Sequence, residues 1–305
     1  MLDYLDEDVS YLLGLIVARG TFIDEGTVKR LIITFPFRNL EAIGINKRFD
    51  QRRSILVSLY SIRDRLGELA GVEPRVVEKT DRIDIIFEFT RATMFWRNLR
   101  LLTRNRTNHL EFEIPKEIFE ASKLMQKEFL RGYADVAGSA RWANRDQVGR
   151  ARIYLDVLNR NWKLPVQLCH LLQDYLDIPV NTITWGHPNI RDPNLADYNA
   201  GRKRSWAREH QVKIYAEAFE KVGFYLEHKQ EILNELSDYN KENFDREPEF
   251  CSPPKSVKLK PIHPEENSDI LPEEIRGKHF DGYWQICCCL GCPRCHKFIL
   301  QRKLR

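Results

Sequence analysis

The stretch Asp8-Val-Ser-Tyr-Leu-Leu-Gly-Leu-Ile-Val-Ala-Arg-Gly20 decides the fold, because it returns later in the chain as Glu128-Phe-Leu-Arg-Gly-Tyr-Ala-Asp-Val-Ala-Gly-Ser139. Aligned without gaps, the two stretches share a leucine and two glycines at an offset of 118 residues (130 minus 12): Leu12 with Leu130, Gly14 with Gly132, and Gly20 with Gly138. Each stretch is an apolar run that ends at a glycine, which is typical of a helix and its stop signal. One helix repeated at this spacing predicts two similar structural halves.

The composition favours a soluble, intracellular protein. Its 305 residues are enough for two domains or for one domain of two similar halves. No stretch approaches the roughly 18 consecutive apolar residues of a membrane-spanning helix. The N-terminus, residues 1–8, is acidic where a targeting peptide would be basic. We expect a bacterial cytoplasm or an organelle as its location, with no membrane partner.

Basic residues gather in three blocks along the chain. Residues 91–110 hold five arginines and no acid, residues 141–163 hold six basic residues against two acids, and residues 201–213 hold five against one. Residues 230–250, in contrast, hold seven acids. Separated basic blocks on a chain of net charge +4 suit a polyanionic partner. For any one block, a solvated helix face is the alternative interpretation.

The elements expected after each motif helix follow a similar order. After the first come strands within 27–38, 75–79 and 82–89 and helices over 52–70 and 93–102; after the second come strands over 150–159, 180–185 and 211–215 and helices over 164–176 and from 216. This order predicts a mixed α/β (α+β) fold of two αββαββα halves. The sheet would be twisted and largely antiparallel, with helices on one face and the other face free.

Composition also predicts where the chain divides. We expect a first half at residues 1–120, a second half at 121–245, a linker at 246–280 and a basic, cysteine-rich tail at 281–305. The linker contains six prolines between residues 246 and 272, which is typical of an extended segment.

The stretches Leu12–Gly20 and Leu130–Gly138 resemble the nine-residue LAGLIDADG motif of homing endonucleases. Flanking sequence resembles that family too, and the resemblance covers about residues 8–240 of the 305. It implies a single-chain, pseudo-twofold monomer whose sheets form a saddle in the major groove of duplex DNA. Because the two halves differ in sequence, the target site would be asymmetric.

Small residues in the two motifs predict how the helices meet. Gly14 and Ala18 are four residues apart and share one helix face, and Gly132 and Val136 occupy the same places in the second copy. A glycine within a helix costs about 1 kcal/mol relative to alanine. Close packing of the two helices is the expected compensation.

The positions that carry catalysis in the family are altered here. In active members the eighth motif position supplies an acid that holds a divalent metal. Here these positions are Arg19 and Ala137. Residual acids nearby are Asp135, Asp24 and Glu25. We expect two-metal cleavage to be lost or weak, with Mg²⁺ a cofactor only if nuclease activity remains, and Arg19 to contact a backbone phosphate instead.

The resemblance also implies which side chains contact nucleic acid. The candidates are basic residues expected on or beside the strands: Lys29, Arg30, Arg38, Arg75 and Arg82 in the first half, and Arg141, Arg145, Arg150 and Arg152 in the second. Arginine suits both guanine edges and phosphates.

Five of the seven cysteines lie in the tail. Cys289, Cys292 and Cys295 form two overlapping C-x₂-C steps, with Cys287, Cys288 or His296 as candidates for the fourth zinc ligand. An iron–sulfur site and unligated thiols remain open alternatives.

These observations favour a sequence-specific protein that binds duplex DNA. One alternative is an RNA-binding maturase that assists intron splicing. A second is an active homing endonuclease with displaced metal-binding acids.

Overall fold

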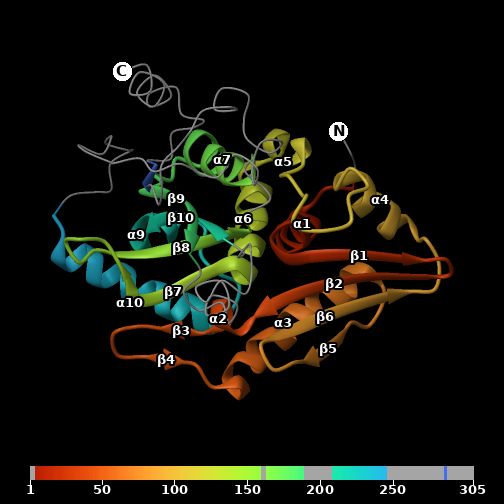
Figure 1. Ribbon diagram of the computed structural model, residues 1–305, viewed down its shortest axis with the longest axis horizontal. Coiled ribbons are helices and arrows are strands. Elements are labelled where there is room, and N and C mark those ends of the chain that lie inside the picture. Colours follow the sequence, from red (N-terminus) through yellow and green to blue (C-terminus); the bar gives the residue numbers. More distant parts are fainter. Residues whose placement is uncertain (1–3, 159–162, 189–207, 246–284, 287–305) are drawn as a thin grey trace, which may run out of the picture.

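The structure is a computed structural model that describes residues 4–158, 163–188, 208–245 and 285–286 (Figure 1). The first half contains these elements: α1 (Glu7–Arg19), β1 (Gly20–Glu25), β2 (Val28–Pro36), α2 (Phe37–Leu40), β3 (Ala42–Ile43), β4 (Arg48–Phe49), α3 (Arg52–Ala70), β5 (Arg75–Glu78), β6 (Arg82–Phe89), α4 (Met94–Leu102) and α5 (Lys116–Glu120). Asp6 caps the N-terminus of α1: its carboxylate accepts from the backbone N–H of Val9 at 2.8 Å.

The second half begins at α6 and has no counterpart of α2, β3 and β4. Its elements are α6 (Lys123–Ala137), β7 (Gly138–Arg145), β8 (Ala151–Leu158), α7 (Lys163–His170) with a π-helical turn at Leu171–Tyr175, β9 (Thr182–Pro188), β10 (Arg208–Tyr215), α9 (Ala216–Phe219), α10 (Glu227–Asn243) and β11 (Gln285–Ile286). Ser122 begins α6 by accepting from the backbone N–H of Met125 at 3.3 Å. The predicted mixed α/β fold with antiparallel sheets is confirmed.

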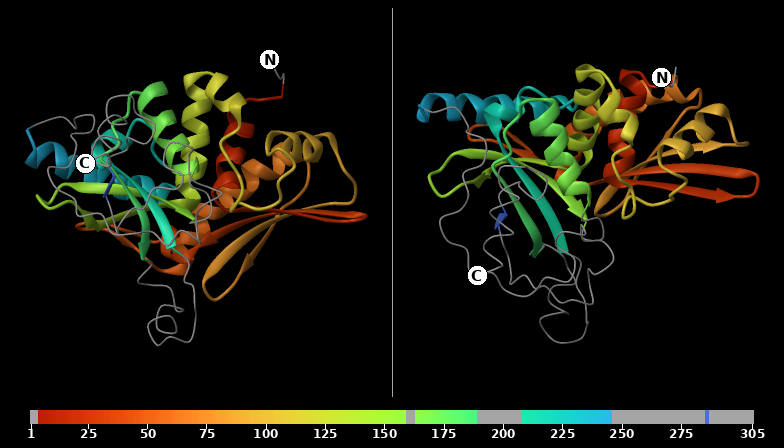
Figure 2. Two further views of the ribbon diagram at one scale, coloured as in Figure 1. Left: turned by 45° about the horizontal axis from the view of Figure 1, so that its top comes forward. Right: turned by 90° about the horizontal axis from the view of Figure 1, so that it is seen from above.

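The described strands form two sheets. One has the order β1-β2-β6-β5, and the other has the order β11-β9-β10-β8-β7-β3-β4. All neighbouring strands are antiparallel except β3 and β7, which pair in parallel at Ile43 and Arg141. Figure 2 shows α1 and α6 side by side between the two halves, with the helices gathered on one side of the strands.

Alternation along the strands separates a buried face from an open one. On β2 and β6, Leu31, Ile33, Ile83 and Ile85 are fully buried in the core. The residues between them point the other way. We call this second surface the open face. Cross-strand pairing assigns to it Arg30, Ile32, Thr34, Arg75, Arg82, Asp84, Ile86 and Glu88 from the first half, and Arg152, Tyr154, Asp156, Gln211, Lys213 and Tyr215 from the second. Four of these side chains are buried by their neighbours: Asp84, Arg152, Asp156 and Lys213.

The β3–β4 hairpin of the first half reaches across to the second half, below β7 in Figure 1. Its turn is held by Glu235 of α10, whose carboxylate accepts from the backbone N–H groups of Ile45 at 3.1 Å and Asn46 at 2.7 Å. A Cβ atom on Gly44 would meet that carboxylate, so any larger residue here would require the Glu235 side chain to move. The hairpin and α10 therefore tie the two halves together.

Several predicted elements need correction. The strand expected over 27–38 ends at Pro36, so Arg38 lies in α2 and not on a strand. The helix expected over 164–176 changes to a π-helical turn after His170, and the helix expected from residue 216 ends at Phe219. The β3–β4 hairpin and α10 were not predicted. The halves are consequently less alike than two αββαββα units.

The linker prediction for 246–280 and the zinc prediction for Cys288, Cys289, Cys292 and Cys295 lie outside the described residues. The boundaries proposed for the two halves stay predictions. In the part of the chain that the structure describes, no helix has the length and apolar character needed to cross a membrane.

Candidate nucleic-acid interface

Helices α1 and α6 approach each other backbone to backbone through their central glycines. A Cβ atom on Gly14 would lie 2.7 Å from the backbone nitrogen of Tyr133 and would clash with the carbonyl oxygen of Phe129. A Cβ atom on Gly132 would clash in the same way with the carbonyl oxygen of Tyr11. No larger side chain fits either place. Ala18 and Val136, one turn further along, are also buried.

The two helices end in the same way. The cap residues Gly20 and Gly138 both have φ of −80°, with ψ of 151° and 143°, and each begins the next strand. The residues just before them, Arg19 and Ala137, are therefore equivalent in the two halves. The structure places the altered eighth motif positions at matching ends of paired helices.

Arg19 is a buried cation at the C-terminal end of α1. It is 4% exposed, and its Nη1 donates to the carbonyl of Ala18 at 2.9 Å. Its Nη2 is buried, and among the described residues it has no hydrogen-bond partner and forms no ion pair with a carboxylate. A cation near the C-terminus complements the helix dipole. That interaction leaves most of the cost of burying the charge uncompensated.

Asp135 lies in the packed interior. It is fully buried, and its carboxylate accepts from the Tyr11 hydroxyl at 2.7 Å and from the backbone N–H groups of Tyr225 at 3.1 Å and Leu226 at 3.2 Å. Burial raises the pKa of Asp135, and the nearby charge of Lys229 opposes that rise. These contacts make Asp135 an internal anchor between the two motif helices and the Tyr225–Leu226 turn.

Lys229 of α10 is the fully buried partner of this anchor. Its ammonium donates to the carbonyl oxygens of Ala134 at 2.9 Å, Asp135 at 3.0 Å and Gly138 at 2.8 Å, so all three donors are used. Burial lowers the pKa of Lys229, and the charge of Asp135 opposes that fall. The end of α6 thus has its own internal cation, supplied by α10.

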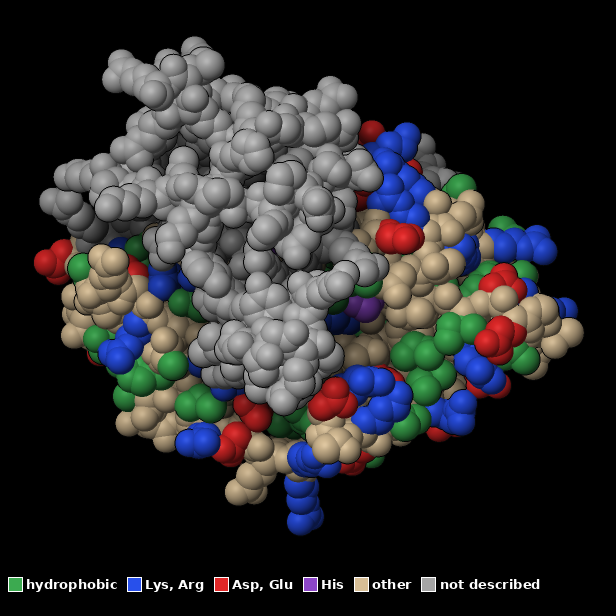
Figure 3. Space-filling view, viewed as in Figure 1, with side chains coloured by type: hydrophobic (Ala, Val, Ile, Leu, Met, Phe, Trp, Pro, Cys, Tyr) green, Lys and Arg blue, Asp and Glu red, His purple; other side chains and the backbone are tan. Residues whose placement is uncertain are grey.

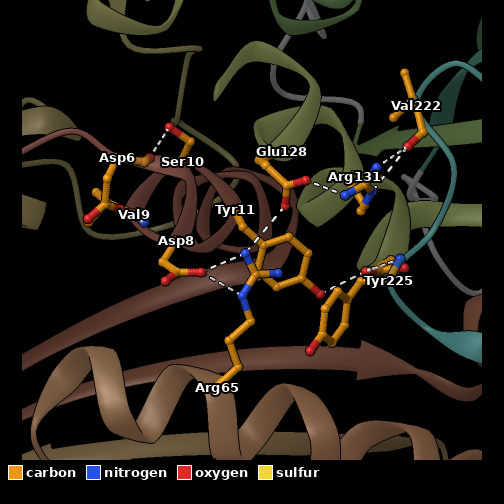
Figure 4. Close-up of polar contacts among 11 residues, drawn as sticks. Asp6, Asp8, Val9, Ser10, Tyr11, Arg65, Glu128, Arg131, Val222 and Tyr225 are labelled. Atoms are coloured by element: carbon orange, nitrogen blue, oxygen red, sulfur yellow. Dashed lines mark hydrogen bonds and ion pairs between the residues drawn. The ribbon is translucent and has the colours of Figure 1, made fainter. Parts of the chain in front are cut away.

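Arg65 of α3 covers the outer side of this cluster (Figure 4). Its guanidinium lies 4.5 Å from the ring centre of Tyr11 and 4.8 Å from that of Tyr225. It also pairs with Asp8 at 2.6 Å and with Glu128 at 3.4 Å. The Asp135 carboxylate is therefore enclosed by protein on this side.

The other two residual acids lie at the far end of β1. Asp24 pairs with Lys29, and Glu25 lies 3.9 Å from Arg30. Five or more strand residues separate them from Arg19, about 16 Å at roughly 3.3 Å per residue. The structure therefore does not bring Asp24, Glu25 and Asp135 together.

The residues at the two helix ends do not fit a bound Mg²⁺ ion. Mg²⁺ prefers carboxylate oxygens in an octahedral arrangement, whereas this region presents the Arg19 guanidinium and the methyl group of Ala137. Across the described ranges, no three His, Cys, Asp or Glu residues group closely enough to hold a metal ion.

The first-half arginines on the open face all pair with acids. Glu88 accepts from Arg30 at 3.2 Å and from Arg75 at 3.0 Å. Asp84 lies 3.5 Å from Arg82 and 2.6 Å from Lys79. Figure 3 shows basic and acidic side chains mixed over this part of the surface. This face is balanced in charge, with Arg75 the most exposed of its arginines at 65% of its side chain.

Hydrogen bonds to protein groups hold Arg152 and Arg141 more firmly than the arginines of the first half. Arg152 is 6% exposed and donates to Asn181 Oδ1 at 3.0 Å, to the carbonyl of Arg145 at 2.6 Å and to the Tyr154 hydroxyl at 3.0 Å. Arg141 donates to the carbonyl of Arg38 at 2.6 Å and pairs with Glu41. These side chains are fixed by protein groups from both halves.

The remaining two candidates have aromatic contacts. The Arg145 guanidinium lies 4.2 Å from the centre of the Trp142 ring. Arg150 pairs with Glu217 and lies 4.5 Å from the centre of the Tyr215 ring. Lys29, in contrast, pairs with Asp24 and donates to the carbonyl of Gly26 at 2.7 Å, at the β1–β2 turn.

Sequence reasoning missed a polar cluster between the halves. Asp156 is 6% exposed and accepts from Asn39 Nδ2 at 2.9 Å and from Gln211 Nε2 at 3.1 Å. Asn39 also donates to the carbonyl of Ala137 at 3.2 Å. Lys213 lies 4.7 Å from the Tyr154 ring centre; burial, then the charge of Arg152, lowers its pKa to about 8. Strand register places Asp156, Gln211 and Lys213 on one face, and α2 brings Asn39 to Asp156. Neither the register nor this helix contact can be read from the sequence.

Paired glycine helices flanked by two antiparallel sheets define the class of fold. Among the solved structures similar to this chain are LAGLIDADG proteins, as the two motifs predict. Variants of the homing endonuclease I-DmoI show 13% identity and a TM-score of 0.41, over 72% of this chain and 97% of that chain. Full-length DUF199/WhiA from Thermatoga maritima shows 14% identity and a TM-score of 0.42, over 78% of this chain and 62% of that chain.

A third similar structure is I-DmoI in complex with DNA and Mn, with 14% identity and a TM-score of 0.38, over 71% of this chain and 96% of that chain. No protein-family model matches the sequence, and no curated protein is significantly similar to it. Likeness at this level concerns the fold and transfers no activity.

Proposed function

We propose that this chain binds duplex DNA sequence-specifically through the open face, and that two-metal cleavage is lost or weak. One observation carries the proposal. At the matching ends of α1 and α6 the side chains are a buried arginine and an alanine, while basic side chains from both sheets share the face beside them. A twisted β-surface of this kind fits the major groove.

The proposed roles follow the surroundings of each side chain. Arg19 contacts a backbone phosphate at the centre of the site. On the open face, Arg30, Arg75 and Arg82 exchange their carboxylate partners for phosphates or guanine edges, whereas Arg152, which is 6% exposed, positions Tyr154 and Asn181 beneath the footprint. Arg38, Arg141, Arg145, Arg150 and Lys29 belong to the periphery of the footprint.

The proposed target is asymmetric and the proposed binding unit is a monomer. The β3–β4 hairpin belongs to the first half alone and α10 to the second half alone, so the two halves present different surfaces. Each half would cover one half-site of a continuous target. Zinc in the tail remains a proposal based on cysteine spacing.

The test begins with selection of bound sequences from a random duplex library, followed by titration of the selected duplex. We expect Arg75→Ala to weaken binding about 3- to 10-fold and to reduce the salt slope by about one counterion. The control is Arg53→Ala, which removes an exposed arginine from α3 on the helical side. Equal binding by wild type and Arg75→Ala would contradict the assignment of the open face.

Two further outcomes distinguish the alternatives. Preference for structured RNA over the selected duplex at equal salt would favour an intron maturase. Mg²⁺-dependent cleavage that disappears on substitution of Asp24, Glu25 or Asp135 would favour an active endonuclease with displaced acids. We expect neither, because these acids are paired or enclosed.

A further inference from the structure

The Arg19 guanidinium lacks the compensation that buried charges normally have. It is 4% exposed, and its Nη2 has no partner among the described residues. A buried donor without an acceptor costs about 1–3 kcal/mol, and more when it carries charge. A bound anion is one kind of group that would remove this cost.

His109 lies beside Arg19 at the same helix end. Its backbone N–H donates to the carbonyl of Gly20 at 3.0 Å, and its ring Nδ1 lies 3.2 Å from the same oxygen. A carbonyl only accepts, so Nδ1 must carry the proton in this contact. In the neutral ring, Nε2 is then the unprotonated nitrogen.

The surroundings keep His109 neutral. Burial and then the charge of Arg19 lower the pKa of His109 to about 4, against the opposing effect of the Gly20 carbonyl. Arg106, from the same loop, is paired with Glu113 at 3.1 Å. An anion placed against the guanidinium would offset the repulsion between Arg19 and a protonated His109.

We propose that Arg19 and His109 form an anion site that takes one phosphate-type group, with His109 gaining a proton at Nε2 as the anion binds. This inference rests on the proposed function for its expected source, a backbone phosphodiester of duplex DNA. A free inorganic anion has the same chemistry. In both cases the ligand supplies the acceptor for Arg19 Nη2, and protonated Nε2 becomes a second donor.

The size of the coupling follows from linkage. If the anion returns the pKa of His109 from about 4 to its ordinary value of about 6.5, binding should be about tenfold tighter at pH 5.5 than at pH 7.5. Sulfate is a suitable first probe because its own charge does not change between these pH values.

The experiment measures sulfate binding and the titration of the His109 ring by NMR in the full chain. We expect wild type to show the tenfold pH effect and a rise in the pKa of His109 with sulfate. His109→Gln should bind sulfate with no pH effect, and Arg19→Met should lose the site. His170→Gln is the control, since that ring lies at the end of α7 and pairs with Asp174 of the following π-helical turn. Thermal unfolding of each variant checks that it is folded.

The selected duplex provides the second arm. A rise in the pKa of His109 with duplex and with sulfate assigns the site to a backbone phosphate, whereas a rise with sulfate alone assigns it to a free anion. If duplex DNA does not bind but sulfate raises the pKa, the proposed function fails and the anion site stands. An unchanged His109 titration with both ligands overturns the site, whatever the affinity for DNA.

Discussion

Replacing Lys229 with methionine is expected to lower the free energy of unfolding by about 3–5 kcal/mol at pH 8. Lys229 is fully buried, and its ammonium supplies donors to three carbonyl oxygens at the end of α6. Methionine retains much of the volume but supplies no donor. It also removes the positive charge that opposes the raised pKa of Asp135.

The loss should be smaller at pH 5. Without Lys229, the pKa of buried Asp135 moves further above its unfolded value of about 3.8. A group with a raised folded pKa contributes stability below the unfolded pKa, and this contribution disappears as pH rises through the folded pKa. Each further pKa unit by which Asp135 is raised therefore lowers the free energy of unfolding at pH 8 by about 1.4 kcal/mol. At pH 5 the protonated carboxyl leaves mainly the lost hydrogen bonds, about 1–3 kcal/mol.

Urea unfolding followed by tryptophan fluorescence and circular dichroism at both pH values measures these losses. Lys221→Met is the matched control, because Lys221 is exposed and donates to a single carbonyl, that of Asp177. The double variant Lys229→Met/Asp135→Asn should recover part of the loss at pH 8, since it removes the uncompensated carboxylate. A loss below about 1 kcal/mol at pH 8, or an equal loss at both pH values, would refute the reasoning.

Two other substitutions test the contacts between the halves. Gly14→Ala should lower the free energy of unfolding by more than about 2 kcal/mol, because the new Cβ would meet backbone atoms of α6. The control, Gly67→Ala in α3, should change it by less than about 1 kcal/mol. Equal effects in chemical denaturation would contradict the close approach of the two helices. Glu235→Ala should lower the free energy of unfolding by about 1–2 kcal/mol and speed hydrogen exchange at the β3–β4 turn. Glu231→Ala, which breaks an exposed pair with Lys47, should cost less than about 0.5 kcal/mol. Unchanged hydrogen exchange in Glu235→Ala would mean that α10 does not hold the hairpin.

The contact between the two motif helices could be predicted because close approach leaves a mark in the sequence. Gly14 and Gly132 are unfavourable within helices, so their repetition at one offset indicates that the two helices touch at these positions. Lys229, which completes the packing around these helices, has no comparable signal in the sequence. Lys229 lies 95 residues from Ala134, and as a charged residue in an acidic segment it is expected to be exposed.

The basic residues of the open face were predictable in part, since alternation places Arg30 and Arg82 on the surface. Their neutralisation was not, because it depends on strand register. Glu88 is 58 residues from Arg30 along the chain, yet β2 and β6 place them directly opposite each other. A count of charges within short blocks of sequence misses ion pairs between strands that are far apart along the chain. The Asn39–Asp156–Gln211 cluster could not be found from the sequence either, because it depends on the register of β8 and β10 and on the contact of α2 with the second half.

The ion pairs of Arg30 and Arg75 with Glu88 affect how the open face would bind DNA. Exposed ion pairs contribute about 0–1 kcal/mol, so Arg30 and Arg75 can leave Glu88 for a phosphate at little cost, but the exposed carboxylate then repels the backbone. Arg152 has no such freedom, because three protein oxygens already fix its orientation. It is also only 6% exposed, so its donors serve the protein interior and keep this part of the sheet rigid. We therefore expect the exposed arginines of the first half to contribute most of the salt-dependent affinity.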